Sequence, residues 1–137
     1  MITLADAGPL IALIDKGQGE VHRTCVAAAR ALEAPLLTTW PCFSEAMYFL
    51  GELAGWRGQA ALWQLVERRV LSLRVPTDAE TTRMRSLMEK YSDTPMDLAD
   101  ASLVAAAESL KLRRVFTLDT DFRVYRINDS IPFEIVP

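Results

Sequence analysis

The chain has 137 residues, half of them hydrophobic, and a formal net charge of −3. This length is enough for a domain with a buried core, and the small net charge gives no indication of a bulk polyanion binder. The apolar runs are broken by charged residues well before the roughly 20 residues that span a bilayer, and no basic segment precedes the first run, so we expect neither a membrane interaction nor a signal peptide.

Apolar runs alternate with helix-like segments along the whole chain. Strands are expected, in chain order, over residues 2–6, 36–39, 71–75, 114–118 and 133–136. Helices are expected over residues 10–16, 21–33 and 43–53, then up to about 68, and over 77–91 and 95–110. Strands that alternate with helices favour an α/β fold with a mostly parallel sheet covered on both faces. No linker or repeat divides the chain, so we expect a single domain over 1–137.

Several local signals place the helix ends. Pro9 suits the first position of a helix. Gly55 lies where a loosened join between two helices is expected. The segments 77–80 and 94–97 both match a capping box, in which a hydroxyl and a carboxylate bind the free N–H groups of the first turn. In the second segment Pro95 would take the first helical position.

Four acidic residues lie where such a fold would bring them together. Asp6 ends the first strand, Asp119 ends the run 115–118, Glu45 lies in the first turn of the helix after residues 36–39, and Asp100 lies near the start of an Ala-rich helix. In open α/β sheets, functional groups collect outside the carboxyl ends of the strands. Four carboxylates at one edge would repel one another unless a cation lay between them, which points to a hard divalent metal.

Each acid also has a structural explanation. Asp6 could cap the helix that follows it, and Glu45 could favour the dipole of its helix. Asp97 precedes Asp100 by one turn, and we assign Asp97 to a helix cap. Asp100 is assigned to the site because it begins a helix whose next seven residues offer only Ser102 as a polar side chain, so the helix must be largely covered.

The last acidic segment offers two aspartates. Asp119 ends a strand and can face the crevice, whereas Asp121 is expected to cap the turn that begins at Phe122. Thr117, in the same strand, could hydrogen-bond a neighbouring carboxylate.

Other kinds of site find little support. His22 is the only histidine and has no serine or cysteine in a nucleophile context, so a hydrolase triad is not expected. A phosphatase of the haloacid dehalogenase type needs a second Asp where this chain has Gly8. A receiver domain needs an acid next to Asp6 and a Lys near the end, but no Lys follows Lys111. Cys25 and Cys42 have neither metal-ligand nor disulfide spacing, which favours buried thiols in a reducing cytoplasm.

The helices over residues 43–69 carry more apolar positions than one core-facing stripe needs. These positions are Tyr48, Phe49, Leu50, Trp56, Leu62, Trp63, Leu65 and Val66. The surplus predicts an exposed apolar patch of the kind that binds a partner.

Four segments together resemble the PIN domain, and within it the VapC-like toxins of type II toxin–antitoxin pairs. The segments are LADAGPL at 4–10, TT at 38–39 through SE at 44–45, DLADASLV at 97–104 and TLDTDF at 117–122. The resemblance covers essentially the whole chain. It implies a three-layer α/β/α sandwich and a Mg²⁺- or Mn²⁺-dependent endoribonuclease that cleaves RNA phosphodiesters with a metal-activated water.

The resemblance also implies the roles of particular residues. The catalytic acids would be Asp6, Glu45, Asp100 and Asp119, with Asp6, Asp100 and Asp119 as metal ligands. It further implies a homodimer and an antitoxin protein that places a basic side chain among the acids. This chain departs from the family at residues 7–8, which bring no hydroxyl, and Asp97 and Asp121 remain alternatives as further metal ligands.

Two other functions are compatible with the same residues. One is a non-catalytic acidic α/β module that binds proteins, and the other is a PIN ribonuclease with no antitoxin. Metal binding distinguishes the first of these from a nuclease, and inhibition by a neighbouring small protein distinguishes the second from a toxin.

Overall fold

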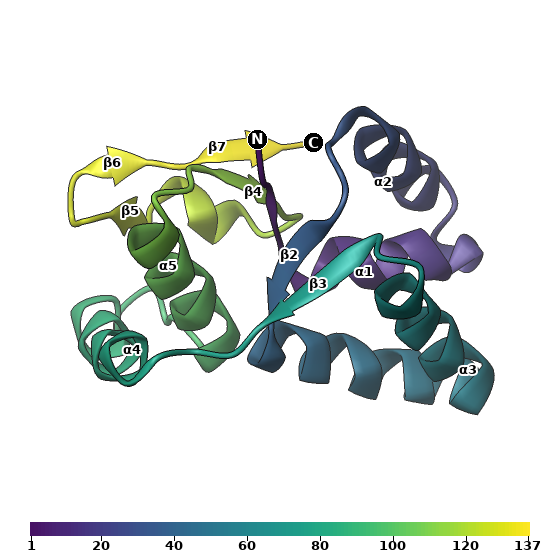
Figure 1. Ribbon diagram of the computed structural model, residues 1–137, viewed down its shortest axis with the longest axis horizontal. Coiled ribbons are helices and arrows are strands. Elements are labelled where there is room, and N and C mark those ends of the chain that lie inside the picture. The colour runs from purple at the N-terminus through teal and green to yellow at the C-terminus, as the bar shows by residue number, and fades with distance from the viewer.

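The computed structural model describes all of residues 1–137 (Figure 1). Its strands are β1 (Leu4–Ala5), β2 (Leu36–Thr39), β3 (Leu71–Arg74), β4 (Arg114–Phe116), β5 (Arg126–Ile127), β6 (Ile131–Pro132) and β7 (Glu134–Val136). Its helices are α1 (Ala7–Ile14), α2 (Glu20–Ala31), α3 (Trp40–Glu67), α4 (Asp78–Lys90) and α5 (Leu98–Leu110), with the short 3₁₀ helices η1 (Lys16–Gln18) and η2 (Thr120–Arg123).

Five strands form one parallel sheet in the order β3-β2-β1-β4-β7. This confirms the predicted strands and their parallel pairing. The expected bounds of β2 agree with the structure residue for residue. The antiparallel hairpin β5–β6 was not predicted, because its strands are two residues long and contain Pro132. Its turn, residues 128–130, includes Asn128 and Asp129, both at positive φ, which Asn and Asp adopt more readily than most residues.

Helices cover both faces of the sheet, which confirms the three-layer α/β/α architecture. Figure 1 shows α4 and α5 on one side and α1, α2 and α3 on the other. Successive residues of the central strands point to opposite faces of the sheet, as in any β-strand. Leu4 and Val115 belong to the hydrophobic core under α4 and α5, whereas Ala5 and Phe116 belong to the core under α1 and α3.

Helix α3 begins earlier than its sequence pattern indicates. The expected start was residue 43, but Thr39 is the N-cap, with its hydroxyl accepting from the Cys42 N–H, and Pro41 lies in the first turn. The expected join is present as a non-helical residue, Gly55, at φ 59° and ψ −148°. Neither α3 nor any other helix combines the length and apolar character needed to cross a membrane.

Two other helix starts differ from expectation. Helix α1 begins at Ala7 rather than at residue 10, so Pro9 occupies the third helical position, whose N–H would have no helical partner in any case. Helix α4 has the predicted cap, since Thr77 accepts from the Glu80 N–H at 3.1 Å. The Glu80 carboxylate does not complete a capping box, because it pairs with Arg74 instead.

Candidate metal centre

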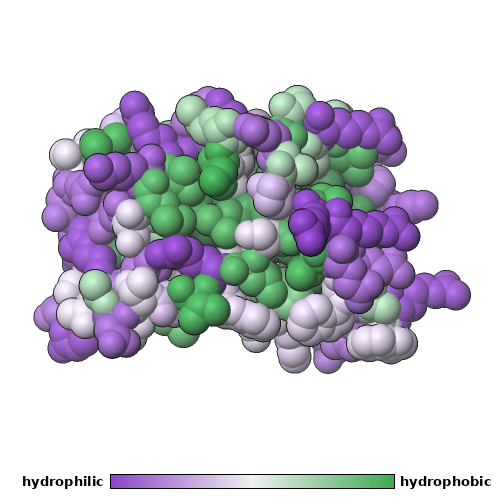
Figure 2. Space-filling view, in the orientation of Figure 1, coloured by the Kyte–Doolittle hydropathy of each residue, from purple (hydrophilic) through white to green (hydrophobic).

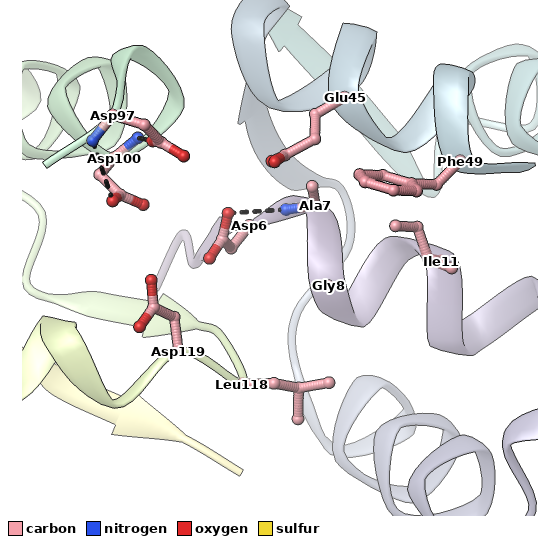
Figure 3. A pocket seen from close by; sticks show the side chains of 10 residues that line it. All are labelled: Asp6, Ala7, Gly8, Ile11, Glu45, Phe49, Asp97, Asp100, Leu118 and Asp119. Atoms are coloured by element: carbon pink, nitrogen blue, oxygen red, sulfur yellow. Dashed lines mark hydrogen bonds between the residues drawn. The ribbon is translucent and has the colours of Figure 1, made fainter. Parts of the chain in front are cut away.

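All four predicted acids line one pocket of about 340 Å³ at the carboxyl ends of the central strands. Figure 3 shows this pocket, which Asp97 also lines. Carboxylate oxygens of Asp6, Asp100 and Asp119 all lie within 4.8 Å of one another. The structure thus brings the three predicted metal ligands together, although they are far apart in sequence.

Asp6 leaves β1 and is the N-cap of α1. Its Oδ1 accepts from the Ala7 N–H at 2.8 Å, and its Oδ2 accepts from the Thr117 hydroxyl at 2.7 Å. The same Thr117 hydroxyl accepts from the Asp119 N–H at 3.0 Å, so it links the two aspartates. The predicted hydrogen bond from Thr117 to a neighbouring carboxylate is therefore confirmed. Helix capping and a place in the pocket are not alternatives for Asp6, since it has both.

Asp97 and Asp100 form a capping box that differs from the predicted one. The expected box had Thr94 as its cap and Pro95 as the first helical residue, but α5 begins at Leu98 and Asp97 is its N-cap. The Asp97 carboxylate accepts from the Asp100 N–H at 2.8 Å, and the Asp100 carboxylate accepts from the Asp97 N–H at 3.4 Å. The assignment of Asp97 to a cap is thus confirmed, with Asp100 rather than Thr94 as its partner.

Asp119 has the capping role that was expected of Asp121. Its carboxylate accepts from the Asp121 N–H at 2.9 Å and caps η2. The expectation that Asp121 caps the turn was wrong, because η2 begins at Thr120 and the residue before it, Asp119, is the N-cap. Asp121 does not line the pocket, whereas Asp119 does.

Glu45 faces the pocket from α3 and stands outside the group of three aspartates. It was expected in the first helical turn. Because α3 begins at Trp40, Glu45 lies in the second turn, so a favourable interaction with the helix dipole no longer explains it. The start of α3 is held against α5 by a 2.6 Å hydrogen bond between the hydroxyls of Thr39 and Ser102. This contact sets Glu45 opposite the start of α5.

Tyr125 is a residue of the site that the sequence pattern did not indicate. Its side chain is fully buried, and its hydroxyl donates to Asp100 Oδ2 at 3.0 Å. The rings of Tyr91 and Phe122 pack edge-on against it, each at 5.1 Å. The only signal in the sequence is a tyrosine soon after Asp119, which no motif distinguishes from an ordinary core residue.

Burial and mutual repulsion disfavour the charged forms of these acids. Burial, and then the negative charge of Asp97, raises the pKa of Asp100 to about 7. Burial also raises the pKa of Asp6, against the hydrogen bonds from Thr117 and Ala7. Burial raises the pKa of Glu45, with the charges of Asp97 and Asp6 acting in the same direction.

The pocket fits a hard divalent cation. Its lining includes five carboxylates and no Lys, Arg or His, so no side chain of the pocket compensates their charge. Oxygen ligands from carboxylates are those that Mg²⁺ prefers, and Mn²⁺ shares this preference. The nearest thiol, Cys42, is buried with its Sγ 3.9 Å from Asp6 Oδ1. Both cysteines are buried and unpaired, as predicted.

Comparison with known proteins shows the fold. No family model and no curated protein matches the chain. Among solved structures, Mycobacterium tuberculosis VapC20, described as a sarcin–ricin loop cleaving toxin, matches with a TM-score of 0.81 and 16% identity over 89% of this chain and 93% of that chain. VapBC2 from Rickettsia felis, bound to a fragment of its promoter DNA, matches with a TM-score of 0.68 and 14% identity over the full length of both chains.

A third structure, a toxin–antitoxin complex from Klebsiella pneumoniae, matches with a TM-score of 0.64 and 21% identity over 86% of this chain and 87% of that chain. The chain therefore has the PIN-like α/β/α fold of VapC proteins. The resemblance inferred from four sequence segments is confirmed at the level of the fold.

Proposed function

We propose that this protein is a divalent-metal-dependent endoribonuclease and the toxin of a toxin–antitoxin pair. The observation that carries the proposal is the cluster of Asp6, Asp100 and Asp119, whose carboxylate oxygens lie within 4.8 Å of one another in a pocket without a cationic side chain. Such a cluster is electrostatically costly unless a cation is bound. The shared fold with VapC20, described as a sarcin–ricin loop cleaving toxin, supports this proposal.

The acidic residues of the pocket have different proposed roles in hydrolysis. Asp6, Asp100 and Asp119 would hold Mg²⁺ or Mn²⁺, which when bound lowers the pKa of a water and neutralises phosphate charge. Of the two remaining acids Asp97 caps α5, so Glu45 is the one free to accept a proton from the attacking water at its carboxylate. Burial and the neighbouring negative charges raise its pKa, which makes its carboxylate a stronger base.

Single-stranded or looped RNA is the proposed substrate. The pocket is open at the surface and receives side chains from α1, α3, α5 and the segment after β4. Unpaired segments can splay a phosphate into such a concave site, whereas a regular duplex holds its phosphates on a cylinder.

An antitoxin and a second copy of the chain are the proposed protein partners. The predicted apolar patch is present on α3, where Tyr48, Phe49 and Trp56 are 62%, 46% and 69% exposed. Figure 2 shows a separate gathering of apolar side chains in the middle of one face, above α3 in this view, between hydrophilic ends. An open groove beside the acidic pocket is lined by Trp40, Tyr48 and Leu98 and shares Glu45 and Asp97 with that pocket. An apolar groove with an acidic rim suits a partner segment that carries apolar and basic side chains.

Cleavage of labelled RNA by the purified protein tests the nuclease function. We expect cleavage with Mg²⁺ or Mn²⁺, none in excess EDTA, and none with Asp100→Asn. Asp93→Asn is the matched control, since Asp93 is an exposed acid in the turn before α5 and should leave the rate unchanged. Undiminished cleavage in excess chelator would contradict the proposed chemistry.

Light scattering and co-expression test the partners. We expect self-association at tens of micromolar, and inhibition by a small protein encoded next to this one. A strict monomer that cleaves RNA and is unaffected by such a protein would identify a ribonuclease with no antitoxin. A protein that binds partners but neither metal nor RNA would identify the non-catalytic module.

A further inference from the structure

The acidic pocket has a second wall that carries no charge. Figure 3 shows Asp97, Asp100 and Asp119 on one side of Asp6, and the apolar side chains of Ile11, Phe49 and Leu118 on the other. We call these three residues the apolar wall. The roles proposed for the carboxylates do not use it.

Phe49 presents an accessible ring at this wall. It follows Glu45 by four residues on α3, so both side chains project from the same side of the helix toward the pocket. The ring is 46% exposed, and Tyr48 packs edge-on against it at 5.4 Å. Because part of this apolar ring is in contact with water, a ligand that covers it would gain favourable free energy from burial of the ring surface.

Glu45 lies beside the apolar wall, and the other residues that line the pocket on this side have no polar side chain. Leu118 is 44% exposed, although it directly precedes Asp119. The floor between the two walls is formed by Ala7 and Gly8, and a Cβ placed at Gly8 would meet Leu118 at 3.7 Å. Ile11, Phe49 and Leu118 therefore suit a flat, uncharged group and offer it no side-chain hydrogen bond of their own.

We propose that the apolar wall binds the nucleobase of the nucleotide next to the scissile phosphate, with the Phe49 ring as the stacking platform. This inference rests on the proposed ribonuclease function. A phosphate drawn to a cation held by the three aspartates leaves its attached base near the pocket, and the apolar wall lies on the side away from Asp97, Asp100 and Asp119. Stacking accepts every base, because each has a π face, so the site should show little base preference at this nucleotide.

Kinetics with Phe49 variants test the proposal. The substrate is an oligoribonucleotide that the wild-type protein cleaves at one mapped bond, together with versions that are abasic at the nucleotide on either side of that bond. Phe49→Ala and Phe49→Leu both remove the ring, whereas Phe49→Trp retains one. Leu53→Ala is the matched control, since Leu53 lies one turn further along α3, is 57% exposed and does not line the pocket.

We expect Phe49→Ala and Phe49→Leu to raise KM by about 5- to 150-fold, the range for loss of one base–aromatic stack, with kcat nearly unchanged. Phe49→Trp and Leu53→Ala should keep the wild-type KM. One of the two abasic substrates should bind the wild-type protein as weakly as the normal substrate binds Phe49→Ala, and should show no further loss with that variant.

Several results would overturn the inference. They are an unchanged KM for Phe49→Ala, an equal loss on normal and on both abasic substrates, or lost binding of a partner protein with unchanged RNA kinetics. The last would assign the apolar wall to that partner. Anisotropy titration of a 2′-O-methylated, uncleavable oligonucleotide gives the same contrast without turnover. Failure of the ribonuclease chemistry and failure of base binding are thus separate results.

Discussion

Asp97 and Asp100 each accept a hydrogen bond from the other's backbone N–H, yet the two carboxylates have different consequences when replaced. Asp97→Ala removes the N-cap of α5 and should lower the free energy of unfolding by about 0.5–2 kcal/mol while much of the activity remains. Asp97→Asn should retain the cap and most of the stability, since Asn is as favourable as Asp at an N-cap. Chemical denaturation and single-turnover cleavage measure the two effects.

Asp100→Asn should abolish activity instead. In the absence of metal it should raise the melting temperature, because it removes one of the mutually repelling charges in the pocket. If Asp97→Ala proved inactive and Asp100→Asn remained active, the two roles would be reversed.

Tyr125 orients Asp100 through a hydrogen bond to Oδ2, which leaves Oδ1 to face the pocket. Tyr125→Phe should weaken Mn²⁺ binding, measured by calorimetry, by about 10- to 100-fold, the usual effect of losing a partner that orients a ligand. Tyr91→Phe is the matched control, since the Tyr91 hydroxyl accepts from the Arg126 N–H at 3.0 Å and does not contact a pocket acid. Equal weakening by both variants would indicate a general packing effect.

At the scale of elements, Gly55 allows α3 to change direction. Its φ of 59° and ψ of −148° lie in a region that almost only glycine adopts, and a Cβ there would meet no atom within 4 Å. Gly55→Ala should therefore destabilise the protein through backbone strain alone, by about 1–3 kcal/mol. Thermal unfolding measures this loss, with exposed Arg57→Ala as the neutral neighbour. A stabilising Gly55→Ala would mean that the two parts of α3 join as one straight helix.

The elements themselves were largely predictable, and their ends were not. Alternating apolar runs suffice to predict the five sheet strands, because burial on both faces demands them. Helix starts were placed about three residues away from those observed, at 10, 43 and 95 against Ala7, Trp40 and Leu98. A proline fits any position of the first turn, so Pro9 and Pro41 do not identify the first helical residue.

The uncertainty in where helices and turns begin also explains why the hydrogen-bond partners of the aspartates were not predicted. The aspartates could be found because each follows or begins an element in sequence. Their hydrogen-bond partners could not, because competition between neighbouring caps, Asp119 against Asp121 and Asp97 against Thr94, depends on where the turn begins. Tyr125 reaches Asp100 only through the packing of the chain after β4, which has no periodic pattern.

At the scale of the molecule, the acidic pocket should make stability fall as pH rises. The folded-state pKa of Asp100 is about 7, above its ordinary value of 3.8, so between these limits the folded protein binds more protons than the unfolded chain. The free energy of unfolding contributed by this group is therefore full below about pH 4 and is lost as pH rises through about 7.

Melting temperatures of the metal-free protein from pH 4 to 8 measure this loss. Glu80, whose pKa is lowered by Arg74, acts in the opposite direction near pH 4, so the contrast with Asp100→Asn isolates the pocket. From pH 4 to 8 we expect the melting temperature of Asp100→Asn to fall less than that of the wild type. With Mn²⁺ bound, the melting temperature of the wild type should no longer show this additional fall. Parallel pH profiles for the two proteins would show that Asp100 is charged throughout.

The hydrogen bond between Thr117 and Asp6 joins residues 111 positions apart, and β1 pairs with β4 across the same interval. A growing chain that has not yet reached Asp119 cannot hold the three-aspartate cluster, whatever else has folded. Ribonuclease activity would then be a property of nearly finished chains only. With the proposed function, the protein could not cut RNA during most of its own synthesis, and fragments left by interrupted translation would lack the activity.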